Sequence, residues 1–214
     1  MNIVDLIQIS AMILSLAVAI IGHEIMHGLT AYKYGDPTAS LAGRLSINPI
    51  VHVDLVGTII VPALLYFSHA PFLFGWAKPV PVNMQVVIRN GGYGGAIAVS
   101  LAGIAYNFLL AILASVILGF IPQAKSLFEA FIQSFLYFTV VYNVVLGVFN
   151  LVPIPPLDGA NALMYLAMKM KFFAFADFMR KIFPYGMIFL IIVLATPLSD
   201  IIFYPAFYLI KILL

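Results

Sequence analysis

Charged residues are rare in this chain of 214 residues and leave long uncharged stretches between them. Charged residues make up only 8% of the chain and hydrophobic residues 64%, whereas a typical soluble domain is about 25% charged. This pattern predicts an integral membrane protein and excludes a soluble enzyme, a disordered chain and a nucleic-acid binder. Six stretches contain no Asp, Glu, Lys or Arg: 6–23, 55–77, 90–124, 130–157, 182–199 and 201–210.

The lengths of these stretches predict an all-α polytopic membrane protein with about five spanning helices. The first, third and fourth stretches reach the roughly 20 apolar residues that a helix needs to cross a bilayer. Two shorter helices are expected around Pro197 and Asp200, and the first span is expected to be a retained helix rather than a signal peptide. The apolar run Leu55–Phe67 is short, and we expect it to be re-entrant.

His23, Glu24 and His27 form an H-E-x-x-H motif at the end of the first apolar run. On a helix, positions i and i+4 share one face, so two imidazoles can bind one metal ion while the Glu acts as general base. The chain has no cysteine, so any metal must be held by His, Asp or Glu. A polar cluster at the water interface is the alternative, but ionisable groups at membrane depth are usually functional.

Asp158 is the best candidate for a third metal ligand. It follows three closely spaced prolines at 153, 155 and 156, which cannot form a helix interior. Irregular backbone at membrane depth is tolerated where it lines a cavity or is buried in protein. Asp158 could instead cap the following helix, and both roles are compatible. His52, Asp54 and, more weakly, His69 are rival ligands.

Two asparagines, Asn107 and Asn150, lie within or at the end of uncharged stretches. Each could bind the substrate backbone or stabilise an oxyanion, or could simply bond to a neighbouring helix.

The segment 74–83 has prolines at 79 and 81. If the segment is extended, the two prolines lie on one edge, where they have no N–H to donate. The N–H groups of Lys78, Val80 and Val82 then lie together on the opposite edge. Such a membrane-associated β-strand or hairpin could bind an extended peptide by strand addition, although an ordinary Pro-rich loop is the alternative.

These motifs together resemble the site-2 protease family of intramembrane zinc metalloproteases. The resemblance rests on H-E-x-x-H at 23–27, A-G-x-x-x-N-F at 102–108 and N-x-x-P-x-x-x-x-D-G at 150–159. The blocks 36–38, 43–57 and 74–83 resemble the compact bacterial branch without PDZ or CBS domains. The family often has Pro where this chain has Ile104. The resemblance implies Zn²⁺ held by His23, His27 and Asp158, Glu24 as catalytic base, and Asn150 at the scissile peptide.

The resemblance also implies one membrane-embedded metalloprotease domain over residues 1–214, with a catalytic core of about 3–170 and C-terminal helices of about 171–214. Its expected activity is cleavage of single-span membrane proteins in or near their transmembrane segments. The expected partners are these substrates and the lipid bilayer, and no nucleic acid is expected to bind. A membrane metal transporter and a non-proteolytic homologue that binds membrane proteins are the alternatives.

The basic residues predict the orientation. With a re-entrant second run and the N-terminus outside, nine of the ten Lys and Arg residues fall on one side, and only Lys125 falls on the other. Because Lys and Arg concentrate on the cytoplasmic side, we expect the site to face the cytoplasm of a bacterial inner membrane. The first and fourth spans then run in the same direction.

Overall fold

The computed structural model describes residues 2–69 and 75–214, and within these ranges it contains helices and no strand. The prediction of an all-α membrane protein is therefore confirmed. The helices are α1 (Ile3–Lys33), α2 (Thr38–Leu41), η1 (Pro49–His52), η2 (Leu55–Ile60), α3 (Val61–Phe67), α4 (Met84–Phe120), α5 (Leu127–Leu151), α6 (Asp158–Lys169), α7 (Phe173–Ile182), η3 (Phe183–Tyr185), α8 (Gly186–Leu194) and α9 (Leu198–Leu213).

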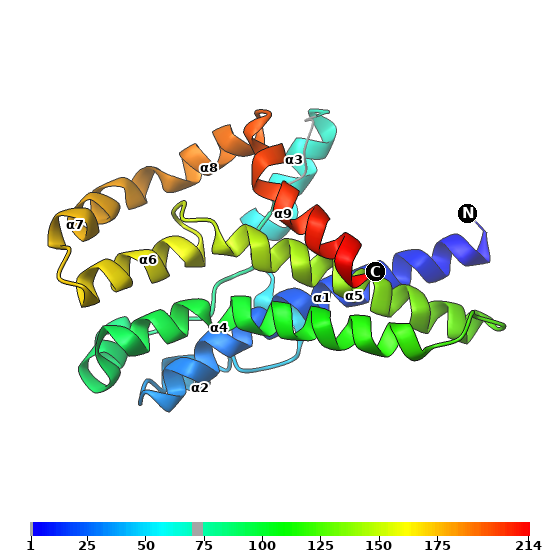
Figure 1. Ribbon diagram of the computed structural model, residues 1–214, viewed down its shortest axis with the longest axis horizontal. Coiled ribbons are helices and arrows are strands. Elements are labelled where there is room, and N and C mark those ends of the chain that lie inside the picture. Colours follow the sequence, from blue (N-terminus) through cyan, green and yellow to red (C-terminus); the bar gives the residue numbers. More distant parts are fainter. Residues whose placement is uncertain (1, 70–74) are drawn as a thin grey trace.

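In the part of the chain that the structure describes, three helices, α1, α4 and α5, are long and apolar enough to cross a membrane, and they match the first, third and fourth uncharged stretches. They pack against one another, with α1 and α5 running in the same direction and α4 running against both (Figure 1). Ser15 of α1 donates to the carbonyl of Phe135 in α5 (2.8 Å). Eight residues further along α1, His23 contacts Asn107 of α4, and Asn107 in turn donates a hydrogen bond to Asn143 of α5. Asn143 also lies eight residues after Phe135, so the two helices advance together. The predicted parallel course of the first and fourth spans is therefore observed.

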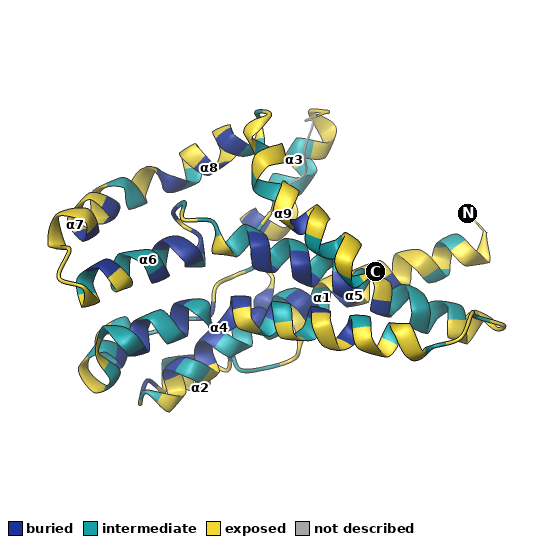
Figure 2. Ribbon diagram, viewed as in Figure 1, coloured by how far each residue is buried: buried dark blue, intermediate teal, exposed yellow. Residues whose placement is uncertain are grey.

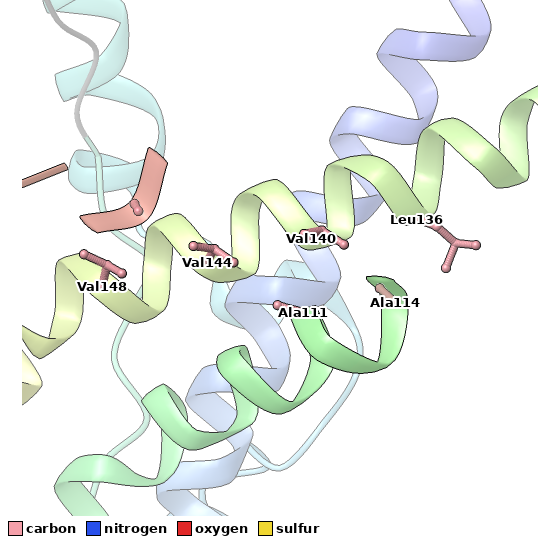
Figure 3. Packing of buried hydrophobic residues seen from close by; sticks show 7 residues of the cluster. Ala111, Ala114, Leu136, Val140, Val144 and Val148 are labelled. Carbon is pink, nitrogen blue, oxygen red and sulfur yellow. The ribbon is translucent and has the colours of Figure 1, made fainter. Parts of the chain in front are cut away.

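Alanine and valine side chains, together with Leu136, form the buried centre of the interface between α4, α5 and α9 (Figure 3). Val140, Val144 and Val148 recur every four residues on one face of α5 and meet Ala111 and Ala114 of α4. In lipid, helices associate mainly through close packing, which small residues permit. Large apolar side chains instead remain exposed on the outer faces of α1, α4 and α5, where lipid would cover them (Figure 2).

Local signals determine where the long helices begin and bend. α1 begins with a capping box in which the Asn2 side chain accepts from the N–H of Asp5 and the Asp5 side chain accepts from the N–H of Asn2. α5 is capped by Ser126, the residue before its first turn, whose hydroxyl oxygen accepts from the N–H of Glu129. Within α4, Gly92 has φ 60° and ψ −164°, a left-handed backbone conformation that only glycine adopts at little cost. The first turns of α4 are therefore set at an angle to the rest.

The prediction of about five spanning helices is not confirmed, because residues 2–69 and 75–214 contain three helices that could each span a membrane, or four spans if the bent C-terminal pair is one. α8 has 9 residues and α9 has 16, too few for each to cross alone. The segments Phe173–Leu194 and Leu198–Leu213 are long and apolar enough only when taken together, and the pair is bent by 80°, as in a broken span or a re-entrant loop. Pro197, which has no N–H to donate, lies at the break between them.

The second apolar run is a short helical segment made of η2, with six residues, and α3, with seven. At 1.5 Å per residue it is about 20 Å long, whereas the hydrocarbon core of a bilayer is about 30 Å thick. One helix of this length cannot cross a bilayer.

The predicted strand or hairpin over 74–83 is not observed. Phe74 lies outside the described residues, and residues 75–83 form neither helix nor strand. The N–H of Trp76 donates to the carbonyl of Gly57 (3.1 Å), and that of Lys78 donates to the carbonyl of His52 (2.9 Å). Because these carbonyls belong to helical turns, the bonds cannot continue into a β-ladder.

Candidate metal centre and catalytic site

His23, His27 and Asp158 converge on one point between α1 and the first residue of α6. Nε2 of His23 lies 3.0 Å from Oδ2 of Asp158, and Nε2 of His27 lies 3.1 Å from the same oxygen. The two Nε2 atoms are 3.1 Å apart. Within residues 2–69 and 75–214, this is the one group of three His, Asp or Glu side chains placed to hold a metal ion.

The other ring nitrogen of each histidine determines its tautomer. Nδ1 of His23 lies 2.6 Å from Oδ1 of Asn107, and Nδ1 of His27 lies 2.7 Å from the carbonyl oxygen of Val99. Because both oxygens can only accept, each Nδ1 carries a proton and each Nε2 presents a lone pair. Two lone pairs and a carboxylate oxygen thus face one another with no proton between them, an arrangement that a cation stabilises.

The dimensions of this group fit zinc. Zinc ligands at 2.0–2.1 Å in tetrahedral geometry lie about 3.3 Å from one another, close to the three separations of 3.0–3.1 Å. Two imidazoles and one carboxylate leave a fourth position open, as catalytic zinc sites do. When bound there, zinc acts as a Lewis acid that lowers the pKa of a coordinated water and polarises a carbonyl group.

A buried chain of amides orients His23 from behind. Asn107 is fully buried, and its Nδ2 donates to Oδ1 of Asn143 (2.8 Å) and to the carbonyl of Ala19 (3.2 Å). Nδ2 of Asn143 donates in turn to the carbonyl of Thr139 (2.8 Å). These donations leave the oxygen of Asn107 to accept from His23. Of the two roles considered for Asn107, these contacts match the bond to neighbouring helices, and they place its side chain behind a metal ligand.

We expect Asn107→Leu to weaken zinc binding about 10- to 100-fold, as is typical when the partner of a metal-bound histidine is removed. The leucine cannot accept the Nδ1 proton of His23, so the ring loses both its preferred tautomer and its orientation. Zinc affinity measured by competition with a chelator tests this. Asn90→Leu is the control, because Nδ2 of Asn90 donates to the carbonyl of Tyr34 (2.7 Å), away from the metal cluster. Equal zinc affinity of the two variants would refute the role of Asn107.

The absence of a side chain at Gly103 makes room for His23. A Cβ atom at Gly103 would lie 2.6 Å from three atoms of the His23 ring, far inside van der Waals contact. The ring of His23 is thus enclosed by Gly103 and Asn107, one turn apart on α4.

Glu24 lies beside the cluster, and its side chain lines a cavity of about 250 Å³. Its Oε2 accepts a hydrogen bond from the backbone N–H of Val80 (2.8 Å). The cavity thus places a carboxylate outside the ligand set next to His27 and Asp158, as a general base requires. Its walls come from α1 (Glu24, His27), the segment before α4 (Pro79, Val80, Val82), α4 (Met84, Val99, Ser100) and α6 (Asp158, Asn161, Tyr165).

The structure places the remaining predicted site residues differently. Val80 and Val82 line the cavity, but the N–H groups of Lys78 and Val80 already donate to His52 and Glu24, so this edge is not free. Nδ2 of Asn150 donates to the carbonyl of Leu146 in its own helix (3.1 Å).

The three rival ligands lie outside the cluster. Nε2 of His52 bonds to the carbonyl of Ser46 (2.7 Å), and Oδ1 of Asp54 caps η2 by accepting from Gly57 (2.6 Å). His69 lies exposed in a turn. The first two residues therefore serve local structure.

Two buried charged residues that we did not predict hold the segment around Val80. Nη2 of Arg44 donates to the carbonyl of Lys78 (2.6 Å), and Oδ2 of Asp36 accepts from the N–H of Asn83 (2.6 Å). Both lie in the sequence blocks 36–38 and 43–57, which was the available signal. Arg44 and Asp36 thus hold the backbone on either side of Val80. In this way they position the Val80 N–H that donates to Glu24.

Asp36 is also bonded to the hydroxyl and the N–H of Thr38. Burial alone would raise the pKa of the Asp36 carboxyl, but the hydrogen bonds from Thr38 and Asn83 outweigh it and lower that pKa below its usual value.

We expect Asp36→Asn to lower the free energy of unfolding by about 1–3 kcal/mol near pH 7, because an amide cannot accept all three bonds. The pKa of Asp36 is lowered in the folded protein, so its contribution is complete above the unfolded pKa of about 3.9 and disappears as the pH falls toward the folded pKa. Thermal unfolding in detergent from pH 7 to pH 3 should show the two proteins converging at the acid end. A constant difference would show that ionisation of Asp36 plays no part.

Comparison with known proteins agrees with this geometry. The profile of peptidase family M50 matches residues 120–194. A Bacillus subtilis (strain 168) protein named "Putative zinc metalloprotease YwhC" is 32% identical over 201 residues, which is 91% of this chain and 84% of that protein. A Mycolicibacterium smegmatis protein named "Putative zinc metalloprotease Rip2" is 30% identical over 141 residues, 66% of this chain and 51% of that protein. No solved structure matches the chain.

Because the region aligned with the Bacillus subtilis protein covers 91% of the chain, it includes both the H-E-x-x-H motif and Asp158. The His-His-Asp cluster with a neighbouring Glu is the group of side chains that a zinc peptidase needs. This chain therefore belongs to peptidase family M50, the site-2 proteases, and is an integral membrane zinc metalloprotease.

Proposed function

We propose that this metalloprotease cleaves single-span membrane proteins in or near their transmembrane segments, as a step of regulated intramembrane proteolysis. One observation carries the proposal. Two of the ligands, His27 and Asp158, line one cavity together with Glu24, and its walls come from the candidate membrane spans α1 and α4, from α6 and from the segment around Val80. A peptide bond that reached Glu24 from between these two spans would come from within or beside the bilayer.

In hydrolysis, Glu24 transfers the proton, and neighbouring groups hold Glu24 and the two histidines in position. Oε2 of Glu24 accepts a proton from the attacking water, and the protonated carboxyl gives it to the departing amine. The N–H of Val80 holds that carboxylate in place (2.8 Å). Asn107 and the carbonyl of Val99 keep the Nδ1 protons on His23 and His27, so both rings remain neutral ligands.

A transmembrane helix hides its peptide groups in internal hydrogen bonds, so we infer that the substrate unwinds before it enters the cavity. The wall formed by Pro79, Val80 and Val82 supports an extended substrate segment there. Asn150, one turn before the proline-rich loop, remains a proposed substrate contact on the basis of the family resemblance.

We propose that the cavity faces the cytoplasm of a bacterial inner membrane and that Leu55–Phe67 is re-entrant. The parallel course of α1 and α5 supports this, as does the nine-to-one distribution of Lys and Arg. The chain has no native cysteine, so single cysteines can be introduced and labelled without a background. Labelling of residues 40–50 and 78–90 from opposite faces of the membrane would refute the arrangement.

The activity itself is tested with purified protein in liposomes that contain a single-span reporter. Mass spectrometry of the products should place the cut within about one helical turn of the membrane-spanning segment, and Glu24→Gln should leave the reporter intact. Cleavage confined to a soluble loop, or zinc flux across the liposome without cleavage, would refute the proposal and would favour a soluble-loop protease or a metal transporter.

A further inference from the structure

Two polar side chains that line the cavity have no role in the hydrolysis described above. Asn161 and Tyr165 of α6 line the cavity together with Asp158 and Glu24. Positions 158, 161 and 165 follow the i, i+3, i+7 spacing, so the three side chains share one face of the helix. Residues three apart on a helix have Cβ atoms about 5–6 Å apart, which places Asn161 next to a metal ligand.

The other polar side chains near the site already have partners. Asn107 and Asn143 bond to each other and to the backbone, Asn150 bonds to Leu146, and the hydroxyl of Ser100 donates to the carbonyl of Ala96. By contrast, the side chains of Asn161 and Tyr165 form no hydrogen bond with any other residue that the structure describes. Both are half-buried, and a polar group in such a wall is stabilised by a ligand that bonds to it.

The chemistry of these two groups suits a peptide backbone. The amide of Asn161 offers both a donor and an acceptor, which match the C=O and N–H of a peptide group. Burial raises the pKa of the Tyr165 phenol, against the opposing effect of Arg180, so its hydroxyl stays protonated and can donate. Pro79, Val82 and Val99, which also line the cavity, are apolar, so they can contact substrate side chains but cannot recognise a backbone through their own side chains.

We propose that Asn161, assisted by Tyr165, binds the backbone of the substrate next to the bond that is cut. The inference rests on the proposed cleavage of an extended peptide in this cavity. α6 then contributes both a metal ligand and the polar contact that aligns the peptide with Glu24.

The test compares kcat and KM for the single-span reporter, using purified zinc-loaded protein in detergent. One hydrogen bond to an uncharged backbone group corresponds to about tenfold in affinity. We therefore expect Asn161→Leu to raise KM about tenfold with kcat within about twofold, because a contact made equally in the ground and transition states changes KM alone. Tyr165→Phe should raise KM several-fold, and Asn90→Leu should leave both constants unchanged.

A substrate series distinguishes direct binding from a structural effect. Synthetic peptides that span the cut carry an ester in place of one amide, placed in turn on each side of the scissile bond. At one position the ester should lower kcat/KM for the native protein and have no further effect in Asn161→Leu, which is the behaviour of two interacting groups in a double-mutant cycle.

Three outcomes would overturn the inference: an unchanged KM in both variants, a parallel loss of bound zinc, or ester effects that add to that of Asn161→Leu. If Asn161→Leu does not fold, Tyr165→Phe with the ester series decides alone. Failure here leaves the proposed function intact as long as the native protein cleaves the reporter and Glu24→Gln does not.

Discussion

Glu24→Gln should lower kcat/KM by about 10³-fold or more while the protein keeps its zinc, since general acid–base catalysis typically contributes about 10²–10⁴. The glutamine side chain has nearly the same shape, and its Oε1 can still accept from the N–H of Val80, which lies 2.8 Å from the native carboxylate. What it lacks is the ability to take up a proton. The measurement is cleavage of the single-span reporter by purified protein, with bound zinc determined by elemental analysis.

The variant is informative because Glu24 is not part of the His-His-Asp cluster. Native activity in Glu24→Gln would exclude this residue as the base. Loss of zinc together with activity would show that Glu24 supports the metal centre, contrary to the role that we give it.

Asp158→Ala should abolish cleavage by a different route, through loss of the metal. Oδ2 of Asp158 is an anionic oxygen that faces both Nε2 atoms, at 3.0 Å from His23 and 3.1 Å from His27. Without it, two neutral imidazoles remain, and a site with two protein ligands binds zinc far more weakly than one with three. We expect zinc to fall below one tenth of the native content after dialysis, and activity to fall with it.

Asp177→Ala is the matched control, because Asp177 pairs with Arg180 on an exposed face of α7 and surface pairs of this kind contribute little. Full zinc content in Asp158→Ala would show that another residue completes the ligand set. Excess zinc that restores activity to Asp158→Ala would support the assignment, since weak binding can be overcome by concentration.

The sequence was sufficient to predict the long helices, because a span of twenty uncharged apolar residues has few other possible structures. It was less informative for the C-terminal region. There the uncharged stretches around Pro197 are individually short, and hydropathy alone cannot say whether two short helices cross separately or form one bent span. The expected strand near Val80 depended on an assumed extended backbone, whereas hydrogen bonds to helical turns shape that segment.

At the site, a rigid local spacing was enough for His23 and His27, because one helix turn fixes their relation. Asn107 shows the limit of such reasoning. Its position in an apolar stretch marked it as important, but the direction in which it points depends on how α4 is rotated against α1. Asn143, Asp36 and Arg44 act through backbone groups remote in sequence, and only the tertiary structure brings these partners together.

The missing side chain at Gly103 links the metal centre to the architecture of the bundle. Because the His23 ring occupies the space beside that glycine, a metal ligand sets the separation of two antiparallel membrane helices. Trimming this ring would open a void between α1 and α4, whereas trimming Asp158 on the shorter α6 would not. Loss of the Asp158 side chain would thus affect the chemistry alone, whereas loss of the His23 ring would affect both the chemistry and the packing of the two helices.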